Sequence, residues 1–276
     1  MATIVSGFIV PHVPLMCVMP DAPSAEQRQV CWDAFATIGR RLTELEVDTV
    51  IVVGDDHYTL FGPQCIPSVL IGIGDLYGPV EPWLTVPRSR IANNEPLAQH
   101  IMRYGHRNGV DWAVAKSLTV DHSVFVPYHH VIRPLERVRM IPVYLNTGVD
   151  PLIDSRRCYQ IGRSIADAVD AWSGNERVAV FASGGIAHWP GNAQMNQLNE
   201  VWDRLVIKHL ESGDVEALAV ISDEDIFNAG GNGGWEIKNY LCMLGAFGNC
   251  TGKLIAYEAV HEWLGSCAYM EMGRLT

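Results

Sequence analysis

Four of the ten histidines follow apolar segments that have the pattern of buried β-strands. They are His12, His57, His122 and His188. An imidazole has a pKa near neutrality, so it can bind a metal ion or transfer a proton. In open α/β sheets, ligands bind beyond the carboxyl ends of the strands. If the strands are parallel, the four imidazoles are expected to converge in that crevice.

A carboxylate accompanies them in the C-terminal part of the chain. A glycine-rich segment over residues 230–234 runs into a predicted helix that carries Glu236 in its first turn. An acidic residue there also complements the helix dipole, which would explain Glu236 if it stood alone. Two neutral imidazoles and one carboxylate, with open positions, form the facial arrangement of non-heme iron(II) oxygenases.

The residues beside two of the histidines fit such a site. Asp55 and Asp56 directly precede His57, and a nearby carboxylate can fix the tautomer of a metal-binding imidazole. Gly184 and Gly185 lie shortly before His188, and glycine allows the backbone to approach a ligand closely.

The elements that must position these groups alternate along the chain. Runs of β-branched and apolar residues predict strands, over 3–10, 47–53, 66–73, 110–115, 138–145 and 177–182. Helical spacing and capping residues predict helices, over 24–46, 94–108, 155–172, 193–210 and 235–247. This alternation predicts an α/β fold, a three-layer α/β/α single domain over residues 1–276 with a mostly parallel or mixed central sheet.

Composition excludes several classes of protein. The formal net charge of −11 argues against nucleic acid as a partner, because phosphate binding requires a basic surface. The seven cysteines are odd in number and contain no Cys-x-x-Cys pair, so reduced thiols are expected rather than disulfides or a thiolate zinc site. The apolar N-terminus lacks the basic region of a signal peptide, and no apolar run is long enough to span a bilayer. A cytoplasmic protein is expected.

The chain resembles the class III extradiol ring-cleavage dioxygenases, the group that contains the catalytic subunit of protocatechuate 4,5-dioxygenase, gallate dioxygenase and 2,3-dihydroxyphenylpropionate dioxygenase. The resemblance extends over nearly the whole sequence in seven ordered blocks. They are PHVP at 11–14, DDHYTLF at 55–61, DHSVFVP at 121–127, IPVYLN at 141–146, SGGIAHWP at 183–190, GGWEIKNYL at 233–241 and YEAVHEWLGSCA at 257–268.

The resemblance implies that His12, His57 and Glu236 bind Fe(II). His188 matches the acid–base histidine of the family, and His122 matches a second active-site histidine that contacts substrate or oxygen. The sequence departs from the family pattern at three positions. The family usually has Ser in place of Pro11, Asn or Pro in place of Asp55, and Ser in place of Ala187. Because the implied ligand and acid–base positions are intact, these departures bear on the substrate more than on the chemistry.

The implied reaction inserts both atoms of O2 into a catechol-type ring and gives a ring-opened semialdehyde. Alternatives are a zinc-binding or non-catalytic relative of the same fold and a metal-dependent hydrolase, since His and Glu also suit zinc. The expected partners are a small aromatic diol and O2, with no nucleic acid or membrane, in a homo-oligomer or with a small second subunit. A substrate carboxylate would require a cation, for which Arg88, Arg90, Arg133 and Lys238 are candidates.

Overall fold

The computed structural model describes residues 1–274, and within this part of the chain nine strands form one mixed sheet. The strands, in chain order, are β1 (Thr3–Val10), β2 (Thr49–Asp55), β3 (Val69–Gly78), β4 (Ser89–Ile91), β5 (Ala113–Thr119), β6 (Arg139–Leu145), β7 (Arg177–Ser183), β8 (Cys250–Val260) and β9 (Gly265–Arg274). The centre of the sheet has the order β6-β2-β7-β1, and all neighbours in this set are parallel.

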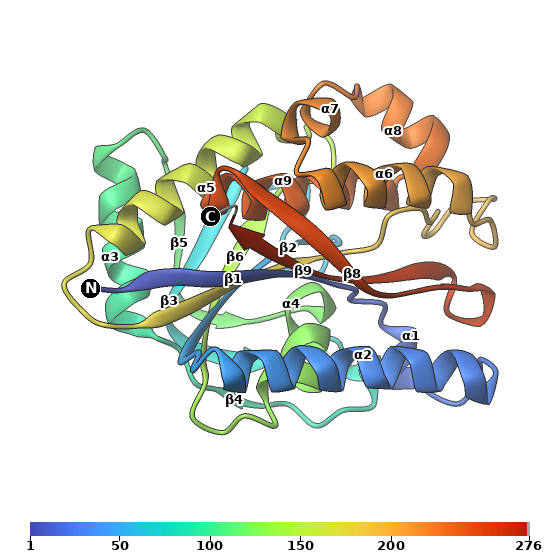
Figure 1. Cartoon of the computed structure of the whole chain (residues 1–276), viewed down its shortest axis with the longest axis horizontal. Coiled ribbons are helices and arrows are strands. Elements are labelled where there is room, and N and C mark those ends of the chain that lie inside the picture. Colours follow the sequence, from blue (N-terminus) through green and yellow to red (C-terminus); the bar gives the residue numbers. More distant parts are fainter. Residues whose placement is uncertain (275–276) are drawn as a thin grey trace.

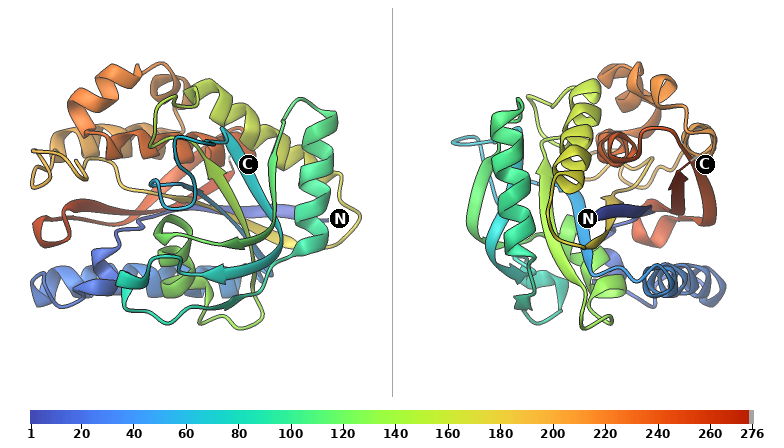
Figure 2. Two further views of the ribbon diagram at one scale, coloured as in Figure 1. Left: turned by 180° about the vertical axis from the view of Figure 1, so that it is seen from behind. Right: turned by 60° about the vertical axis from the view of Figure 1, so that its left-hand side comes forward.

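Helices cover both faces of the sheet. The α-helices are α1 (Leu15–Val18), α2 (Ala25–Glu44), α3 (Glu95–Arg107), α4 (His122–Pro127), α5 (Ser155–Asp170), α6 (Glu200–Ser212), α7 (Val215–Ala219), α8 (Asp223–Gly230) and α9 (Ile237–Phe247). Short 3-10 or π segments are η1 (Pro82–Leu84), η2 (Tyr128–Ile132), η3 (Gly233–Glu236) and η4 (His261–Trp263). In Figure 1 and Figure 2, α3, α5, α6 and α9 lie on one face of the sheet, and α2 and α4 lie on the other.

Strand β2 shows why the central strands are continuously apolar. Its side chains alternate between two cores: Ile51 and Val53 pack with α5 and α9, whereas Val50 and Val52 pack with α2. A parallel strand that is covered on both faces needs apolar residues at every position. The predicted three-layer α/β/α arrangement with a mixed sheet is therefore confirmed.

The edges of the sheet are antiparallel. On one side β3 pairs antiparallel with β6 and with β4, and β5 runs parallel to β3. On the other side β9 pairs antiparallel with β1 and forms a hairpin with β8. Neither β4 nor the β8–β9 hairpin was predicted from the sequence.

Two predicted elements were wrong in extent. The helix predicted over 193–210 begins only at Glu200, because the Asn199 side chain caps it by accepting from Trp202 N, and the preceding residues form a loop. The strand predicted over 110–115 is instead the more polar β5. Val110 and Trp112 are buried beside α3 rather than in a strand. Their apolar character therefore reflects the packing of the loop that connects α3 to β5.

The remaining predicted elements coincide with observed ones to within a few residues. Ser24 caps α2 by accepting from Gln27 N. All seven cysteines lie in the described part of the chain, and none forms a disulfide. No helix among residues 1–274 combines the length and the apolar character needed to cross a membrane.

Candidate active site

Three imidazoles meet at one carboxylate oxygen. The Nε2 atoms of His12, His57 and His188 lie 3.4, 3.5 and 3.2 Å, respectively, from Glu236 Oε1. His122 lies against the same group, with its ring centre 4.3 Å from that of His57 and 5.5 Å from that of His12. The structure thus brings together all five residues that the sequence indicated.

The sheet explains the position of three of them. His12, His57 and His188 follow β1, β2 and β7, which are adjacent and parallel. Their carboxyl ends therefore open onto a common crevice, as expected.

His122 reaches the site by a different route, so the expected reason for its position was wrong. It follows β5, which is parallel to β3 and therefore runs opposite to the central strands. After β5 the chain returns across the sheet, where α4 packs against β2. His122 is the first residue of α4 and not part of a loop after a parallel central strand.

Hydrogen bonds fix the orientation of His12. Its Nδ1 lies 2.9 Å from Ser183 Oγ, and Ser183 Oγ donates its own proton to Ser123 O at 2.6 Å. The serine oxygen must therefore accept from His12 Nδ1–H. In the neutral ring this leaves Nε2 unprotonated and facing Glu236, and that buried nitrogen has no hydrogen-bond partner.

His57 is likewise oriented by a hydrogen-bond acceptor at its Nδ1, which here is the Asp121 carboxylate. Its Nδ1 lies 3.3 Å from Asp121 Oδ2, while Tyr144 and Ser123 donate hydroxyl protons to Asp121 Oδ1. A carboxylate that accepts from Nδ1–H leaves Nε2 available as a metal ligand. Sequence reasoning gave this task to Asp55 and Asp56, and both assignments were wrong.

Asp55 and Asp56 have other contacts. Asp55 Oδ2 lies 3.6 Å from His57 Nε2, on the side of the ring that faces Glu236, and Asn239 donates to its Oδ1. Asp55 Oδ2 is buried without a hydrogen-bond partner. The Asp56 carboxylate accepts from the backbone N–H groups of residues 59–61 and so holds the loop after His57.

Glycines allow Glu236 and His188 to approach the loop after β7. Gly185 N donates to Glu236 Oε2 at 2.6 Å. Gly184 has a φ of +155°, and a Cβ added there would lie 2.8 Å from Glu236 Cβ. A Cβ on Gly233 would lie 2.3 Å from the His188 ring. These contacts show close approach of the backbone to Glu236, while approach to a bound ligand at Gly184 and Gly185 stays a prediction.

The charges of the cluster are mutually dependent. Burial tends to raise the pKa of Glu236, but His12 and His188 outweigh it and hold that pKa well below its usual range. Burial tends to lower the pKa values of His12 and His57, but the neighbouring carboxylates raise both. Burial raises the pKa of Asp55 to about 6. In this buried cluster the charged form of each group therefore depends on a neighbour of opposite charge.

The spacing of the donor atoms in this cluster fits a bound metal ion. Ligands about 2.1 Å from one ion and at roughly right angles lie about 3 Å apart, close to the His12, His57 and Glu236 separations above. His12, Asp55, His57 and Glu236 each offer one donor atom within 4.8 Å of the others. Two imidazoles with carboxylate oxygen suit Fe(II) and also Zn²⁺.

Glu81 orients His122 and was not recognised in the sequence. Its Oε1 accepts from His122 Nδ1 at 2.7 Å and from His122 N at 2.9 Å. Burial, followed by the charge of His57, lowers the pKa of His122. No local signal marked Glu81, because it lies 41 residues before its partner in the sequence.

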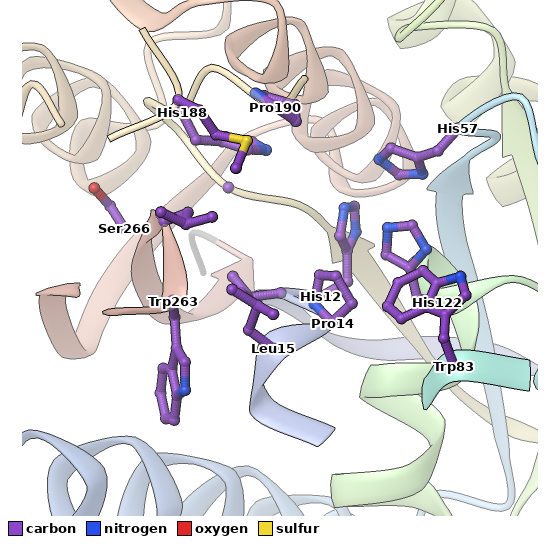
Figure 3. Close-up of a pocket in the computed structure, with 15 residues that line it drawn as sticks. His12, Pro14, Leu15, His57, Trp83, His122, His188, Pro190, Trp263 and Ser266 are labelled. Carbon is purple, nitrogen blue, oxygen red and sulfur yellow. The ribbon is translucent and has the colours of Figure 1, made fainter. Parts of the chain in front are cut away.

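A pocket of about 240 Å³ opens beside the histidines. Figure 3 shows His12, His57 and His122 gathered at one end and Trp263 and Ser266 at the other. Apolar side chains form most of its wall, among them Val13, Leu15, Trp83, Met195, Trp263 and Leu264. Such a mostly apolar pocket with a few convergent polar groups is typical of small-molecule sites.

Comparison with known proteins agrees with this geometry. Residues 6–270 match the family described as the catalytic LigB subunit of aromatic ring-opening dioxygenase. Two similar proteins are both named 2,3-dihydroxyphenylpropionate/2,3-dihydroxicinnamic acid 1,2-dioxygenase. The one from Photorhabdus laumondii is 23% identical over 96% of each chain. The one from Paraburkholderia xenovorans is 25% identical over 92% of each chain.

A solved structure supports the fold. The crystal structure of an uncharacterized protein from Escherichia coli K12 superimposes with a TM-score of 0.55 at 13% identity, covering 98% of this chain and 100% of the other. The family match extends over nearly the whole chain and includes every histidine of the site as well as Glu236. The chain therefore belongs to the LigB family of aromatic ring-opening dioxygenases.

Proposed function

We propose that the chain is a non-heme Fe(II) extradiol dioxygenase, with residues 1–276 as one catalytic domain, that cleaves a catechol-type ring to a semialdehyde. One observation carries the proposal: His12 and His57 both turn Nε2 towards Glu236 Oε1, at 3.4 and 3.5 Å. Their Nδ1 atoms are held from behind by Ser183 and Asp121. This is the arrangement expected of preoriented metal ligands.

His12, His57 and Glu236 would hold the iron. When bound, Fe(II) supplies a Lewis acid that acidifies a catechol hydroxyl and a centre at which O2 reacts. The pocket brings the diol to the histidine end and surrounds the rest of the ring with apolar side chains. Holding both reactants at one place supplies much of the rate enhancement, because it removes the entropic cost of their encounter.

His188 is the proposed acid–base residue. It lines the pocket, and its Nε2 lies 3.2 Å from Glu236 Oε1, beside the position proposed for the diol. From there the imidazole takes a proton from a catechol hydroxyl and returns one later in ring opening, the two tasks of a general acid–base residue.

His122 is proposed to contact a substrate oxygen. Glu81 accepts from its Nδ1, so Nε2 is the nitrogen that faces the pocket. Since burial lowers its pKa, His122 is suited to a neutral hydrogen-bonding role. The relatives named above act on a catechol that bears a propionate side chain, which supports a catechol as the substrate class.

Zinc gives the main alternative, because the same His and Glu donors suit Zn²⁺ in a non-oxygenase relative or a hydrolase. The test is anaerobic purification, reconstitution with Fe(II), and measurement of O2 uptake with catechols and 2-aminophenol while absorbance is followed. Stoichiometric O2 consumption with a yellow product supports the dioxygenase. Tight zinc binding without O2 uptake supports the alternative.

The assembly and location of the protein are part of the same proposal. We propose a cytoplasmic enzyme that acts as a homo-oligomer or with a small second subunit. Size-exclusion chromatography with light scattering distinguishes a monomer from an oligomer. If Fe(II) binds at one per chain but no diol is cleaved, co-purification from the native host tests for the second subunit.

A further inference from the structure

We infer that the substrate carries an apolar, uncharged substituent on its diol ring, as an alkyl- or arylcatechol does. The inference rests on the proposed ring cleavage at the same site and specifies its substrate class. It departs from the propionate named for the relatives of the chain.

The walls of the pocket carry the argument. With the diol placed at the histidine end, a ring substituent extends towards Leu15 and Trp263. Leu264 lines the same pocket. Trp83 and Met195 also line the pocket and are 51% and 39% exposed, and the Trp83 ring centre lies 6.2 Å from that of His122. Burying an alkyl group against such surfaces contributes about 0.8 kcal/mol per methylene, whereas burying an unpaired carboxylate is strongly unfavourable.

The hydroxyl on the far wall is already used. Ser266 lines the pocket, but its Oγ donates to Asp203 Oδ2, which also accepts from Tyr257 at 2.6 Å. Asp203 is fully buried. A substrate carboxylate at this wall would therefore find a hydroxyl whose proton is committed, with a buried carboxyl group directly behind it.

The cations that were candidates for a substrate carboxylate are engaged elsewhere. Arg88 donates to two backbone carbonyls, and Arg90 pairs with Asp75. Arg133 contacts the side chain of its helical neighbour His129. Within residues 1–274, the pocket wall includes no Arg or Lys.

Lys238 is the fourth candidate and the most deeply buried. Its ammonium contacts Asp223 Oδ1 at 2.6 Å and donates to Ile153 O at 2.8 Å. It is fully buried and does not line the pocket. The Lys238 ammonium therefore links α9 to Asp223 and to the backbone at Ile153, and it does not reach the pocket.

A matched pair of ligands tests the inference. 3-Propylcatechol and 3-(2,3-dihydroxyphenyl)propionate differ only in a terminal methyl group or carboxylate. Their binding is measured without O2 by quenching of tryptophan fluorescence, since Trp83 and Trp263 line the pocket. We expect propylcatechol to bind at least about tenfold more tightly, or about 1.4 kcal/mol. Equal or tighter binding of the propionate overturns the inference.

Turnover separates this inference from the proposed function. O2 uptake with both ligands and a higher kcat/KM for propylcatechol supports both. No uptake with either ligand, in the presence of any subunit that co-purifies, counts against ring cleavage, while the ratio of the two Kd values still decides the substrate class. The pair 4-propylcatechol and 3-(3,4-dihydroxyphenyl)propionate is measured in the same way to cover the other ring position.

A charge placed in the wall provides the complementary test. Met195→Lys adds a cation to the pocket, and we expect the preference for propylcatechol to shrink at least fivefold. Val201→Lys is the matched control, because Val201 is 83% exposed on α6 and outside the pocket, and it should keep the wild-type ratio. Leu15→Lys provides a second position if Met195→Lys does not fold. An unchanged ratio in a folded pocket variant contradicts the assignment of this wall to the substituent.

Discussion

The Asp121 carboxylate lies 3.3 Å from His57 Nδ1, on the side of the imidazole ring that faces away from Glu236. Asp121 therefore orients a proposed metal ligand without itself facing the metal site. Tyr144 and Ser123 hold the carboxylate in place through its other oxygen. A residue in this position is expected to control metal affinity through the tautomer and basicity of its histidine.

Asp121→Asn is expected to weaken Fe(II) or Co(II) binding about 10- to 100-fold, because outer-shell partners of metal ligands have effects of that size. Competition with a chelating indicator measures the affinity. Asp56→Asn is the matched control, since Asp56 precedes His57 but contacts only backbone N–H groups. Equal metal affinity in Asp121→Asn and wild type would contradict the role of Asp121.

His188→Asn is expected to retain iron and lose about 10²- to 10⁴-fold in kcat, the usual contribution of a general acid–base residue. The reason is that His12, His57 and Glu236 remain to bind the metal. Metal content by mass spectrometry and O2 uptake are measured on the same preparation. Near-normal turnover would exclude His188 from proton transfer, and loss of iron would make it a ligand instead.

Gly233→Ala is expected to destabilise the protein by about 1–3 kcal/mol, as overpacking usually does, and to lower kcat. Its Cβ would lie 2.3 Å from the His188 ring, which must then move. Urea unfolding and steady-state kinetics measure the two effects. Gly39→Ala in α2 is the control: its Cβ meets no atom within 4 Å, and alanine should be neutral or stabilising in the helix. Equal stability and equal kcat in the two variants would show that a side chain at position 233 does not displace the His188 ring.

The buried carboxyl group of Asp203 is expected to make the stability of the fold depend on pH. Burial raises its pKa to about 6 from an ordinary value of 3.8, so the folded state binds this proton more tightly than the unfolded state. The resulting stabilisation is complete below about pH 4 and is lost as the pH rises through 6. A shift of about two pKa units corresponds to about 3 kcal/mol.

Asp203→Asn removes this titration and keeps an oxygen that can accept from Ser266 and Tyr257. The free energy of unfolding of the variant, relative to wild type, should therefore be higher at pH 7 than at pH 4.5 by about 2 kcal/mol. Urea unfolding of the metal-free protein at both values measures the difference. A relative stability that does not change with pH would show that Asp203 does not titrate in this range.

The central part of the fold and the site was predictable because local sequence determines it. Strands β1, β2 and β7 are apolar on both faces, and the histidine after each is a short loop away. Parallel strands place such loops at one edge of the sheet. The family resemblance then supplied the assignment of ligand and acid–base roles that position alone left open, and that assignment stays a prediction.

What sequence reasoning missed depends on contacts between distant segments. Glu81 meets His122 across 41 residues, and Asp121 meets His57 across 64. The β8–β9 hairpin was missed because β8 is half-buried and lacks the continuous apolar run of the central strands. His122 was placed correctly for an incorrect reason, since the reversal of β5 is set by its pairing with β3 and not by its own residues.

The most direct test of ring cleavage is O2 consumption by the Fe(II)-reconstituted protein with 3-propylcatechol, measured together with the absorbance of the product. One O2 consumed per diol, with a yellow semialdehyde and with no activity in Glu236→Gln, is the predicted result. Iron bound at one per chain without O2 consumption on any catechol or 2-aminophenol, in the presence of any subunit that co-purifies, would contradict the proposed function.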